Sequence, residues 1–262
     1  MKKTLIKKLP PDLPPELDRF VRGARVFDSS CSPEASVCFI DKDGGYYLKK
    51  AAKGTLEREA LMTGYFHSLG LGVEVLSYLT YGEHDLLLTA SAVGEDCVAA
   101  KYLDDPKRLC EVLATSLRSL HETDFSACPI QNRTAEYLET VEKNFKSGNY
   151  DVSHFPDSFG FVSAEDAWRV FCEGKDSFCT DTLIHGDYCL PNVILNDWKL
   201  SSFIDLGNGG AADRHIDLFW GLWTLWFNLK TDAYYSRFID AYGRDRVDTD
   251  VLRTVAAAEV FG

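Results

Sequence analysis

The sequence predicts an α+β fold of two lobes, an antiparallel β-sheet with one helix followed by a mostly helical lobe. Strand-like apolar runs are concentrated in the first 90 residues, and amphipathic helical patterns dominate the rest. We expect the first lobe over residues 1–92 and the second over residues 93–262. Residues 90–96 change from apolar to small and polar, which is typical of a hinge between lobes.

The first lobe is predicted to consist of short strands around one helix. Thr55 and Gly70 bracket the helix expected over residues 55–69, as N-cap and C-cap. Turn-rich segments separate the strand-like runs, so neighbouring strands are expected to pair antiparallel. The predicted strands are 24–27, 35–40, 46–49, 73–78 and 86–89.

The second lobe is predicted from helical periodicity. A long, aromatic, loop-like stretch covers residues 147–163, and loops of this length tend to carry function. The apolar run 218–227 is about half of the ~20 residues that a membrane span needs, so we interpret it as a buried core helix. The other predicted elements are helices 106–121, 134–146 and 164–172 and a strand at 182–184.

Composition narrows the class of partner. The net charge of −12 argues against a nucleic-acid or anionic-membrane surface and favours cationic small molecules. The eight cysteines form no C-x-x-C pair, and no histidine accompanies them at zinc-ligand spacing. Free cysteines and an N-terminus without a signal-like apolar stretch lead us to expect a cytoplasmic protein.

A polar motif interrupts the second lobe. His185-Gly186-Asp187 is followed by Asn192 and, after a further strand, by Asp205-Leu206-Gly207. This order matches the catalytic Asp, the metal-binding Asn and the second metal-binding Asp of kinases. It predicts that Asp187 accepts the proton of an attacking hydroxyl and that Asn192 and Asp205 hold Mg²⁺. We expect His185 to tie the loop together through hydrogen bonds.

A strand lysine and a helix glutamate would complete the phosphate site. Kinases pair such a lysine with a glutamate and hold it against the phosphates. Lys49 ends the third predicted strand and Lys50 follows it; only one of the two can face inward, and side-chain alternation cannot choose between them. The Ser-rich segment 28–34 has two possible interpretations, a plain hairpin turn or a loop that covers phosphates.

Taken together, these motifs resemble the aminoglycoside phosphotransferases, and most closely their kanamycin-type 3'-phosphotransferase branch. The resemblance covers nearly the whole chain. It implies a protein-kinase-like two-lobed fold that uses Mg²⁺ and ATP or GTP. By position it selects Lys49 over Lys50 and Glu59 over Glu57. The motifs that carry it are 32–35, 47–49, 56–59, 185–192, 203–207 and 210–214.

The resemblance also implies further contacts. On the nucleotide side, it implies that Tyr47 stacks on adenine, that the loop of Ser32 touches phosphate, and that Ser91 and Ala92 line the hinge. On the acceptor side, Glu259 and Phe261 match acceptor-binding positions near the C-terminus, and Asp157 is a charged candidate in the long loop. Asn208 stands where the family commonly has arginine, and the 218–227 helix is aromatic where relatives show charged residues.

We therefore expect an enzyme that phosphorylates a hydroxyl of an aminoglycoside, with the 3'-hydroxyl as the expected position, and thereby gives resistance. One alternative keeps the fold and changes the acceptor to an amino alcohol, another antibiotic or a metabolite. A nucleotide-binding pseudokinase is the other alternative. It is disfavoured because a protein without catalysis has no need for the full set of Lys49, Glu59, Asp187, Asn192 and Asp205.

Overall fold

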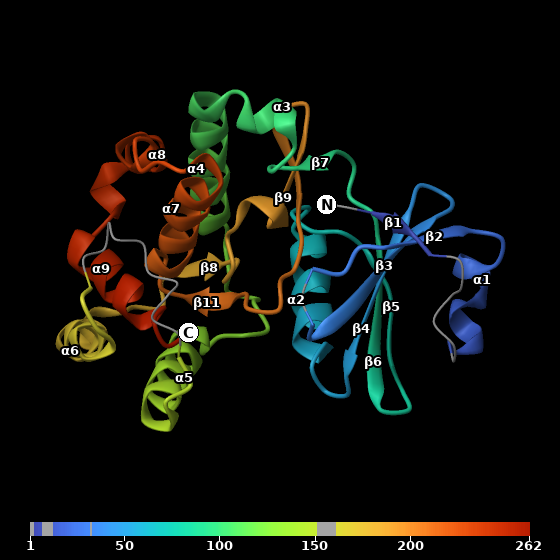
Figure 1. Ribbon diagram of the computed structural model, residues 1–262, viewed down its shortest axis with the longest axis horizontal. Coiled ribbons are helices and arrows are strands. Elements are labelled where there is room, and N and C mark those ends of the chain that lie inside the picture. The colour runs from blue at the N-terminus through green and yellow to red at the C-terminus, as the bar shows by residue number, and fades with distance from the viewer. Residues whose placement is uncertain (1–2, 7–12, 32, 151–160) are drawn as a thin grey trace. The chain divides into compact units, whose positions relative to one another are not determined.

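The structure of the chain is a computed structural model that describes residues 3–6, 13–31, 33–150 and 161–262 (Figure 1). Two compact units can be distinguished. The sheet unit comprises Met1–Asp96, Val193–Asp197 and Ser201–Asn208, and the helical unit comprises Cys97–Asn192, Trp198–Leu200 and Gly209–Gly262. The chain therefore returns to the sheet unit after residue 192, so the units are not two consecutive halves. The lobe boundary after Ala92 stays a prediction.

The sheet unit contains a six-stranded sheet in the order β1-β2-β3-β4-β6-β5, and each neighbouring pair is antiparallel. The expected strands are confirmed, although β5 begins two residues later than predicted. Asp43, Gly44 and Gly45 form the β3–β4 turn with φ of 48°, 94° and 100°. Glycine adopts such positive φ values without strain. The strands are β1 (Thr4–Leu5), β2 (Arg25–Asp28), β3 (Ala35–Asp41), β4 (Tyr46–Ala52), β5 (Val75–Tyr81) and β6 (His84–Ala90).

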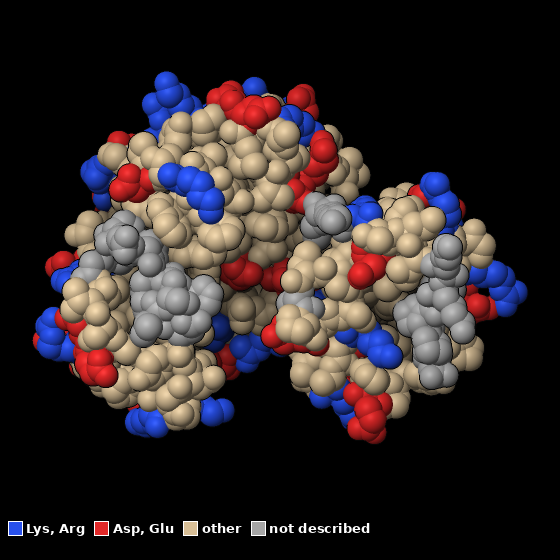
Figure 2. All heavy atoms as spheres, viewed as in Figure 1, with Lys and Arg blue, Asp and Glu red and all other residues tan. Residues whose placement is uncertain are grey.

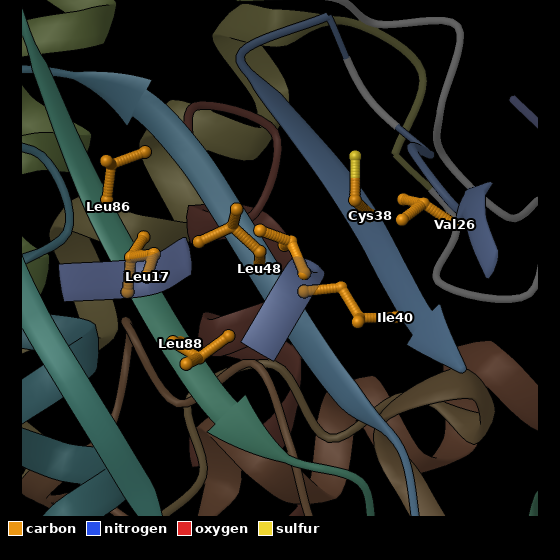
Figure 3. Packing of buried hydrophobic residues seen from close by; sticks show 8 residues of the cluster. Leu17, Val26, Cys38, Ile40, Leu48, Leu86 and Leu88 are labelled. Carbon is orange, nitrogen blue, oxygen red and sulfur yellow. The ribbon is translucent and has the colours of Figure 1, made fainter. Parts of the chain in front are cut away.

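This sheet buries apolar side chains on both faces. Leu86 and Leu88 of β6 lie on one face, in a cluster that Leu17 and the short helix α1 (Asp18–Val21) also join (Figure 3). Leu87 lies on the other face, packed with Leu56 at the start of α2 (Glu57–Ser68). Alternation along a strand sends successive side chains to opposite faces, so β6 anchors both layers.

Asp85 of β6, rather than Thr55, caps the start of α2. Its Oδ2 accepts hydrogen bonds from the backbone N–H groups of Gly54 at 2.8 Å and Leu56 at 3.2 Å. Thr55 instead donates its hydroxyl to the carbonyl of Ala52. The predicted Thr55 cap is therefore wrong, because a buried carboxylate from the sheet supplies the acceptor that the first turn needs.

The hydrogen bonds to Asp85 also set its ionisation. Burial alone would raise its pKa, but donors from Thr80 and Tyr78 and from the α2 start outweigh burial and lower it. Asp85 is 0 % exposed, so this stabilised charge is internal. The capping carboxylate thereby joins β5, β6 and α2 around one ionised group.

A small sheet of order β10-β9-β7 follows the main one. Its strands are β7 (Glu95–Asp96), β9 (Val193–Asn196) and β10 (Lys199–Phe203). β7 pairs antiparallel with β9, as Glu95 lies opposite Leu195. Asp197 and Trp198 make the β9–β10 turn with φ of 48° and 64°, the left-handed geometry typical of tight hairpins.

The helical unit holds most of the helices and a two-stranded sheet. β8 (Thr182–Ile184) pairs antiparallel with β11 (Gly210–Ala212). The predicted helix over residues 106–121 is confirmed at both ends, and the other predicted helices are present with ends that differ by up to three residues. The helices are α3 (Ala100–Leu103), α4 (Pro106–His121), α5 (Arg133–Ser147), α6 (Ala164–Gly174), α7 (His215–Leu229), α8 (Tyr235–Tyr242) and α9 (Thr249–Ala258).

Helix α7 only partly fits the interpretation as a buried core helix. Leu218, Leu222 and Leu225 on it are buried, as expected. Trp220 and Trp223 are half-buried and Phe227 is 47 % exposed, so one face of the helix reaches solvent. The apolar run alone could not reveal this, because the exposed face is as apolar as the buried one.

The surface carries charges of both signs. On the face that Figure 2 shows, Lys and Arg side chains are interspersed with Asp and Glu side chains. Within the described part of the chain, no helix combines the length and the apolar character that a membrane crossing requires.

Candidate active site

Three charged side chains of the sheet unit converge: Lys49 on β4, Glu59 on α2 and Asp205 after β10. The Lys49 Nζ lies 2.7 Å from Glu59 Oε2 and 2.9 Å from Asp205 Oδ1. The side chains of Lys49 and Glu59 are 22 % and 12 % exposed, whereas that of Asp205 is 50 % exposed. The inner ion pair is therefore shielded, and the outer carboxylate offers oxygen to solvent. This geometry distinguishes Lys49 from Lys50, which alternation could not do.

Burial and charge act against each other in this cluster. Burial alone would lower the pKa of Lys49, but the charges of Asp205 and Glu59 outweigh it and raise the pKa, so Lys49 is a cation. Burial raises the pKa of Glu59, and Lys49 only partly reverses that rise. The cluster thus holds one firmly protonated amine between two carboxylates.

The chain around Asp205 explains why it meets Lys49. The backbone N–H of Phe203 donates to the carbonyl of Leu71 at 2.8 Å, directly after α2. The Phe203 ring packs against Phe66 of α2 at 6.2 Å between centroids. Because α2 also carries Glu59, this packing brings the end of β10 to the ion pair. Asp205 itself has φ of 60°, a conformation that Asp tolerates better than most residues.

Tyr47, expected to stack on adenine, lies one residue before Leu48 on β4. Its ring packs against Phe39 of β3 at 5.1 Å between centroids. The Lys3 ammonium lies 3.2 Å from the Phe39 centroid and 5.2 Å from that of Tyr47. Burial raises the pKa of Tyr47, with a smaller contribution from Asp96. The stacking role of Tyr47 stays a prediction.

Of the residues expected in the hinge and the phosphate loop, the structure describes Ser91 and Ala92. The backbone N–H of Ser91 donates to Gly45 at 3.0 Å, and its hydroxyl lies 3.4 Å from the carbonyl of Ala92. This backbone bond ties the predicted hinge segment to the β3–β4 turn. Ser32 lies outside the described residues, so its predicted phosphate contact is not addressed by the structure.

In the helical unit, Asp187 and Asn192 are joined side chain to side chain. The Asn192 amide donates to Asp187 Oδ2 at 2.8 Å and to the Asp187 carbonyl at 3.0 Å. Asn192 is buried and Asp187 is half-buried. Because Nδ2 makes both bonds, the Oδ1 of Asn192 is the atom with which this side chain can ligate a cation. The orientation of Asp187 is thereby fixed by the residue five positions later.

The Asp187 loop is anchored from beneath by Asp217 of α7. Asp217 accepts the backbone N–H groups of His185 and Gly186, each at 2.7 Å, and contacts His121 Nε2 at 3.2 Å. It is 0 % exposed. Its negative charge is compensated by these donors, as a buried charge requires. The sequence analysis missed Asp217, although an acidic residue inside an apolar helix is itself a signal of a buried partner.

His185 takes the structural role that we expected. It is fully buried, and its Nδ1 accepts the backbone N–H of Asp187 at 3.3 Å. Further anchors are the Tyr188 hydroxyl, which donates to Leu113 at 2.9 Å, and Thr224 of α7, which accepts the Leu190 N–H at 3.1 Å. The loop is therefore held at several points, and its one carboxylate, that of Asp187, is half-buried.

Near the C-terminus, Glu259 follows α9 and is held by a side chain of α5. Its Oε1 accepts the Tyr137 hydroxyl at 2.8 Å. Burial raises the pKa of Glu259 to about 7; hydrogen bonds from Tyr137 and the Trp220 indole and attraction by Arg133 lower it, whereas the charge of Asp187 raises it further. The ionisation of Glu259 therefore depends mainly on its burial and, to a lesser degree, on the charge of Asp187.

Phe261, expected near the acceptor, is completely buried. Its ring meets Phe145 and Trp168 edge-on, at 5.4 and 5.8 Å between centroids. Asn144 donates its amide to the Phe261 carbonyl at 2.7 Å. The Phe261 ring thus anchors the chain end, and any acceptor contact at this position would have to come from elsewhere in the residue. Asp157 lies outside the described residues.

The sequence of the chain matches a known protein family over most of its length. Residues 26–254 match the phosphotransferase enzyme family. The chain belongs to that family. It is 50 % identical over 249 residues, 95 % of either chain, to a probable aminoglycoside 3'-phosphotransferase of Lactococcus lactis subsp. lactis.

Solved structures agree with the fold. A crystal structure of an aminoglycoside-3'-phosphotransferase of type VIII superposes with a TM-score of 0.74 at 22 % identity, covering 94 % of this chain and 97 % of that one. An aminoglycoside phosphotransferase of Streptomyces rimosus, in complex with ADP and streptomycin, gives a TM-score of 0.69 at 22 % identity and covers 87 % and 91 %. At this identity the likeness establishes the protein-kinase-like fold.

The family implies a magnesium ion, and the donor chemistry of this chain fits one. Mg²⁺ takes oxygen ligands, commonly one or two protein groups with phosphate and water completing its shell. Asp205 exposes half of its carboxylate, and Asn192 keeps an amide oxygen while its Nδ2 is engaged by Asp187. The two donor residues lie in different units, and each has the required oxygen.

Proposed function

We propose that this family member transfers the γ-phosphoryl group of ATP or GTP to a hydroxyl of an aminoglycoside, at the 3' position, and so confers resistance. One observation carries the choice of acceptor, namely the 50 % identity over 95 % of both chains to a probable aminoglycoside 3'-phosphotransferase. The retained charged residues support the chemistry.

On the nucleotide side, Lys49 supplies positive charge to the phosphates. Its protonation is secured by Glu59 and Asp205, so it keeps its charge at any physiological pH. Asn192 and Asp205 are the residues that would hold Mg²⁺, which when bound neutralises charge on the phosphate oxygens. Tyr47, Ser91 and Ala92 are proposed for the adenine, and Ser32 for a phosphate.

On the acceptor side, Asp187 receives the proton. The acceptor hydroxyl oxygen forms a bond to the γ-phosphorus, the bond from that phosphorus to the bridging oxygen breaks, and the hydroxyl proton passes to the Asp187 carboxylate. Asn192 fixes that carboxylate through the 2.8 Å contact. The products are the nucleoside diphosphate and the phosphorylated acceptor.

Carboxylates and net charge support a cationic acceptor. The charge of Asp187 raises the pKa of Glu259, and the chain carries a net charge of −12. Aminoglycosides carry several ammonium groups, which such a region attracts. Asp157 and the Phe261 position stay predictions for this contact. All eight cysteines are free, which supports a cytoplasmic setting.

The test is direct turnover. Purified protein is incubated with Mg-ATP, or Mg-GTP, and a panel of aminoglycosides with and without a 3'-hydroxyl. We expect nucleoside diphosphate release and a mass gain of one phosphoryl group only for members that have that hydroxyl. Turnover restricted to amino alcohols or metabolites would replace the acceptor and keep the kinase chemistry. Nucleotide binding without turnover of any acceptor would favour the pseudokinase.

A further inference from the structure

Lys3 places a cation on the face of the six-stranded sheet that carries Lys49. Phe39 of β3 lies opposite Tyr47 of β4, and Val37 lies opposite Lys49 in the same register. Residues that are opposite each other, or two positions apart on one strand, point to the same side of a sheet. Phe39 and Tyr47 therefore share the face of Lys49. The Lys3 ammonium lies 3.2 Å from the centroid of the Phe39 ring, so it lies on this face too.

The Phe39 ring also reaches the segment predicted as the hinge. A Cβ atom added at Gly45 would lie 2.8 Å from Cε2 of Phe39 and 3.2 Å from Cβ of Ser91, so both side chains converge on this glycine. The ring that holds the Lys3 ammonium thus borders Tyr47 on one side and Ser91 on the other. These are two of the residues proposed for the adenine, and the sequence analysis assigned no role to Lys3 beside them.

The ammonium lies beside the Tyr47 ring and not on it. Its distance to the Tyr47 centroid is 5.2 Å, against 3.2 Å to that of Phe39, where the electron-rich ring face attracts it. A base stacked on Tyr47 would therefore meet the ammonium at its edge. Burial lowers the pKa of Lys3, and the charges of Asp41 and Asp96 oppose that shift. The amine is thus partly withdrawn from water, which strengthens a hydrogen bond that it donates.

An ammonium at the edge of a purine distinguishes guanine from adenine. It has three donors and no acceptor. Guanine presents O6 and N7 side by side, and both are acceptors that one lysine can contact together. Adenine presents the N6 amino group beside N7, so one contact is lost and a donor faces the cation.

We propose that Lys3 is a specificity-determining residue of the nucleobase site, which donates to O6 and N7 of a guanine stacked on Tyr47 and makes GTP the preferred phosphoryl donor. This inference rests on the proposed function and decides between ATP and GTP, which the proposed function leaves open. Phe39 acts through Lys3 as a positioning residue, because its ring holds the ammonium at the edge of the base.

The test compares Lys3→Met with Lys3→Arg by calorimetric titration of Mg-GTP and of Mg-ATP without any acceptor. We expect the wild type to bind GTP about tenfold more tightly than ATP. Lys3→Met should lose that preference through weaker GTP binding, while the Kd for ATP stays within about twofold. Lys3→Arg should keep the preference, because a guanidinium donates to the same two guanine acceptors and also stacks on an aromatic ring.

Lys53→Met is the matched control. Lys53 is an exposed lysine of the same unit, directly after β4, and its replacement removes the same charge. Both dissociation constants should stay at the wild-type values. Phe39→Leu is a second variant that keeps an apolar side chain and removes the ring face, and it should lower the GTP preference. Lys3 is exposed, so its replacement leaves the core intact, and thermal melting establishes that each variant is folded.

The outcomes separate the inference from the proposed function. A wild type that prefers ATP, or a folded Lys3→Met protein with the wild-type ratio of the two dissociation constants, would overturn the role of Lys3. Tighter nucleotide binding in Lys3→Met would overturn it as well, because Lys3 would then obstruct the base. If no aminoglycoside is phosphorylated but a GTP preference is present and depends on Lys3, the proposed acceptor fails and the inference stands. If aminoglycosides are phosphorylated and the nucleotide preference is independent of Lys3, the function stands and the inference fails.

Discussion

The two units of the molecule hold their functional carboxylates in opposite ways. In the sheet unit, Glu59 and Asp205 are both ion-paired with Lys49, at 2.7 and 2.9 Å. In the helical unit, Asp187 and Glu259 are held by neutral donors, the Asn192 amide at 2.8 Å and the Tyr137 hydroxyl at 2.8 Å. One site has a fixed cation, and in the other burial raises the pKa of Glu259, with a smaller contribution from the charge of Asp187.

This difference follows the charge of the molecules proposed for each site. A nucleoside triphosphate is a polyanion, so a lysine that is already positioned and protonated stabilises it without rearrangement. An aminoglycoside is a polycation and brings its own positive charge. Carboxylates held by neutral donors remain available for that charge, at the cost of mutual repulsion when the acceptor is absent. Variants in each unit should therefore affect different substrates.

The largest effect is expected for Asp187→Asn, which removes the proton acceptor and keeps the shape of the side chain. We expect kcat to fall by ~10²–10⁴-fold, equivalent to roughly 3–5 kcal/mol of transition-state stabilisation, with little change in the KM for ATP. Steady-state kinetics and a thermal melt measure both. Asp197→Asn, on the exposed β9–β10 turn, is the control. Unchanged turnover in Asp187→Asn would refute the role of this residue.

A smaller effect, on the nucleotide side only, is expected for Lys49→Met. Losing the lysine leaves Glu59 and Asp205 facing each other without a cation, and kcat/KM for ATP should fall about 10²-fold, since breaking such a pair costs roughly 2–5 kcal/mol. Acceptor binding, measured by calorimetry without nucleotide, should not change. Lys50→Met is the matched control on the next residue of β4. Equal damage from both variants would contradict the assignment of Lys49.

Much of the architecture was predictable because it depends on local patterns. Helix α4 carries a regular apolar repeat between Pro106 and His121, and its ends were predicted correctly. The Asp187, Asn192 and Asp205 motif was recognisable since the chemistry demands those residue types in that order. The pairing of Lys49 with Glu59 could be predicted only from the family resemblance, and the structure shows the two side chains in contact at 2.7 Å.

What could not be predicted depends on partners distant in sequence. Asp85 replaces Thr55 as the cap of α2, because the fold brings a buried strand carboxylate to the first turn. Asp217 accepts hydrogen bonds from the backbone of the Asp187 loop, 31 and 32 positions away. The α7 rings reach solvent although the run looks like core. In each case tertiary packing decides a question that composition leaves open.

The smallest effect concerns pH and the helical unit alone. Burial raises the pKa of Glu259 to about 7, so this carboxylate ionises across the neutral range. Above pH 7 it is charged and attracts an ammonium group, whereas below pH 7 it is protonated and attracts it less. The acceptor KM should therefore fall a few-fold between pH 6 and pH 8, whereas Glu259→Gln should lack this component.

As pH rises, the free energy of unfolding should fall while acceptor binding improves, because both depend on the ionisation of Glu259. A carboxyl whose pKa is higher in the folded state binds its proton more tightly there than in the unfolded chain, so its contribution to stability is present at low pH and is lost as pH rises toward and beyond 7. Glu259→Gln should consequently gain stability relative to the wild type between pH 5 and pH 8, measured by urea unfolding. Glu139→Gln, on the exposed side of α5, controls for removal of a carboxylate. A wild type and a Glu259→Gln variant with parallel pH profiles of both acceptor KM and unfolding free energy would show that Glu259 is ionised throughout, and the contrast between the two units would then rest on Asp187 alone.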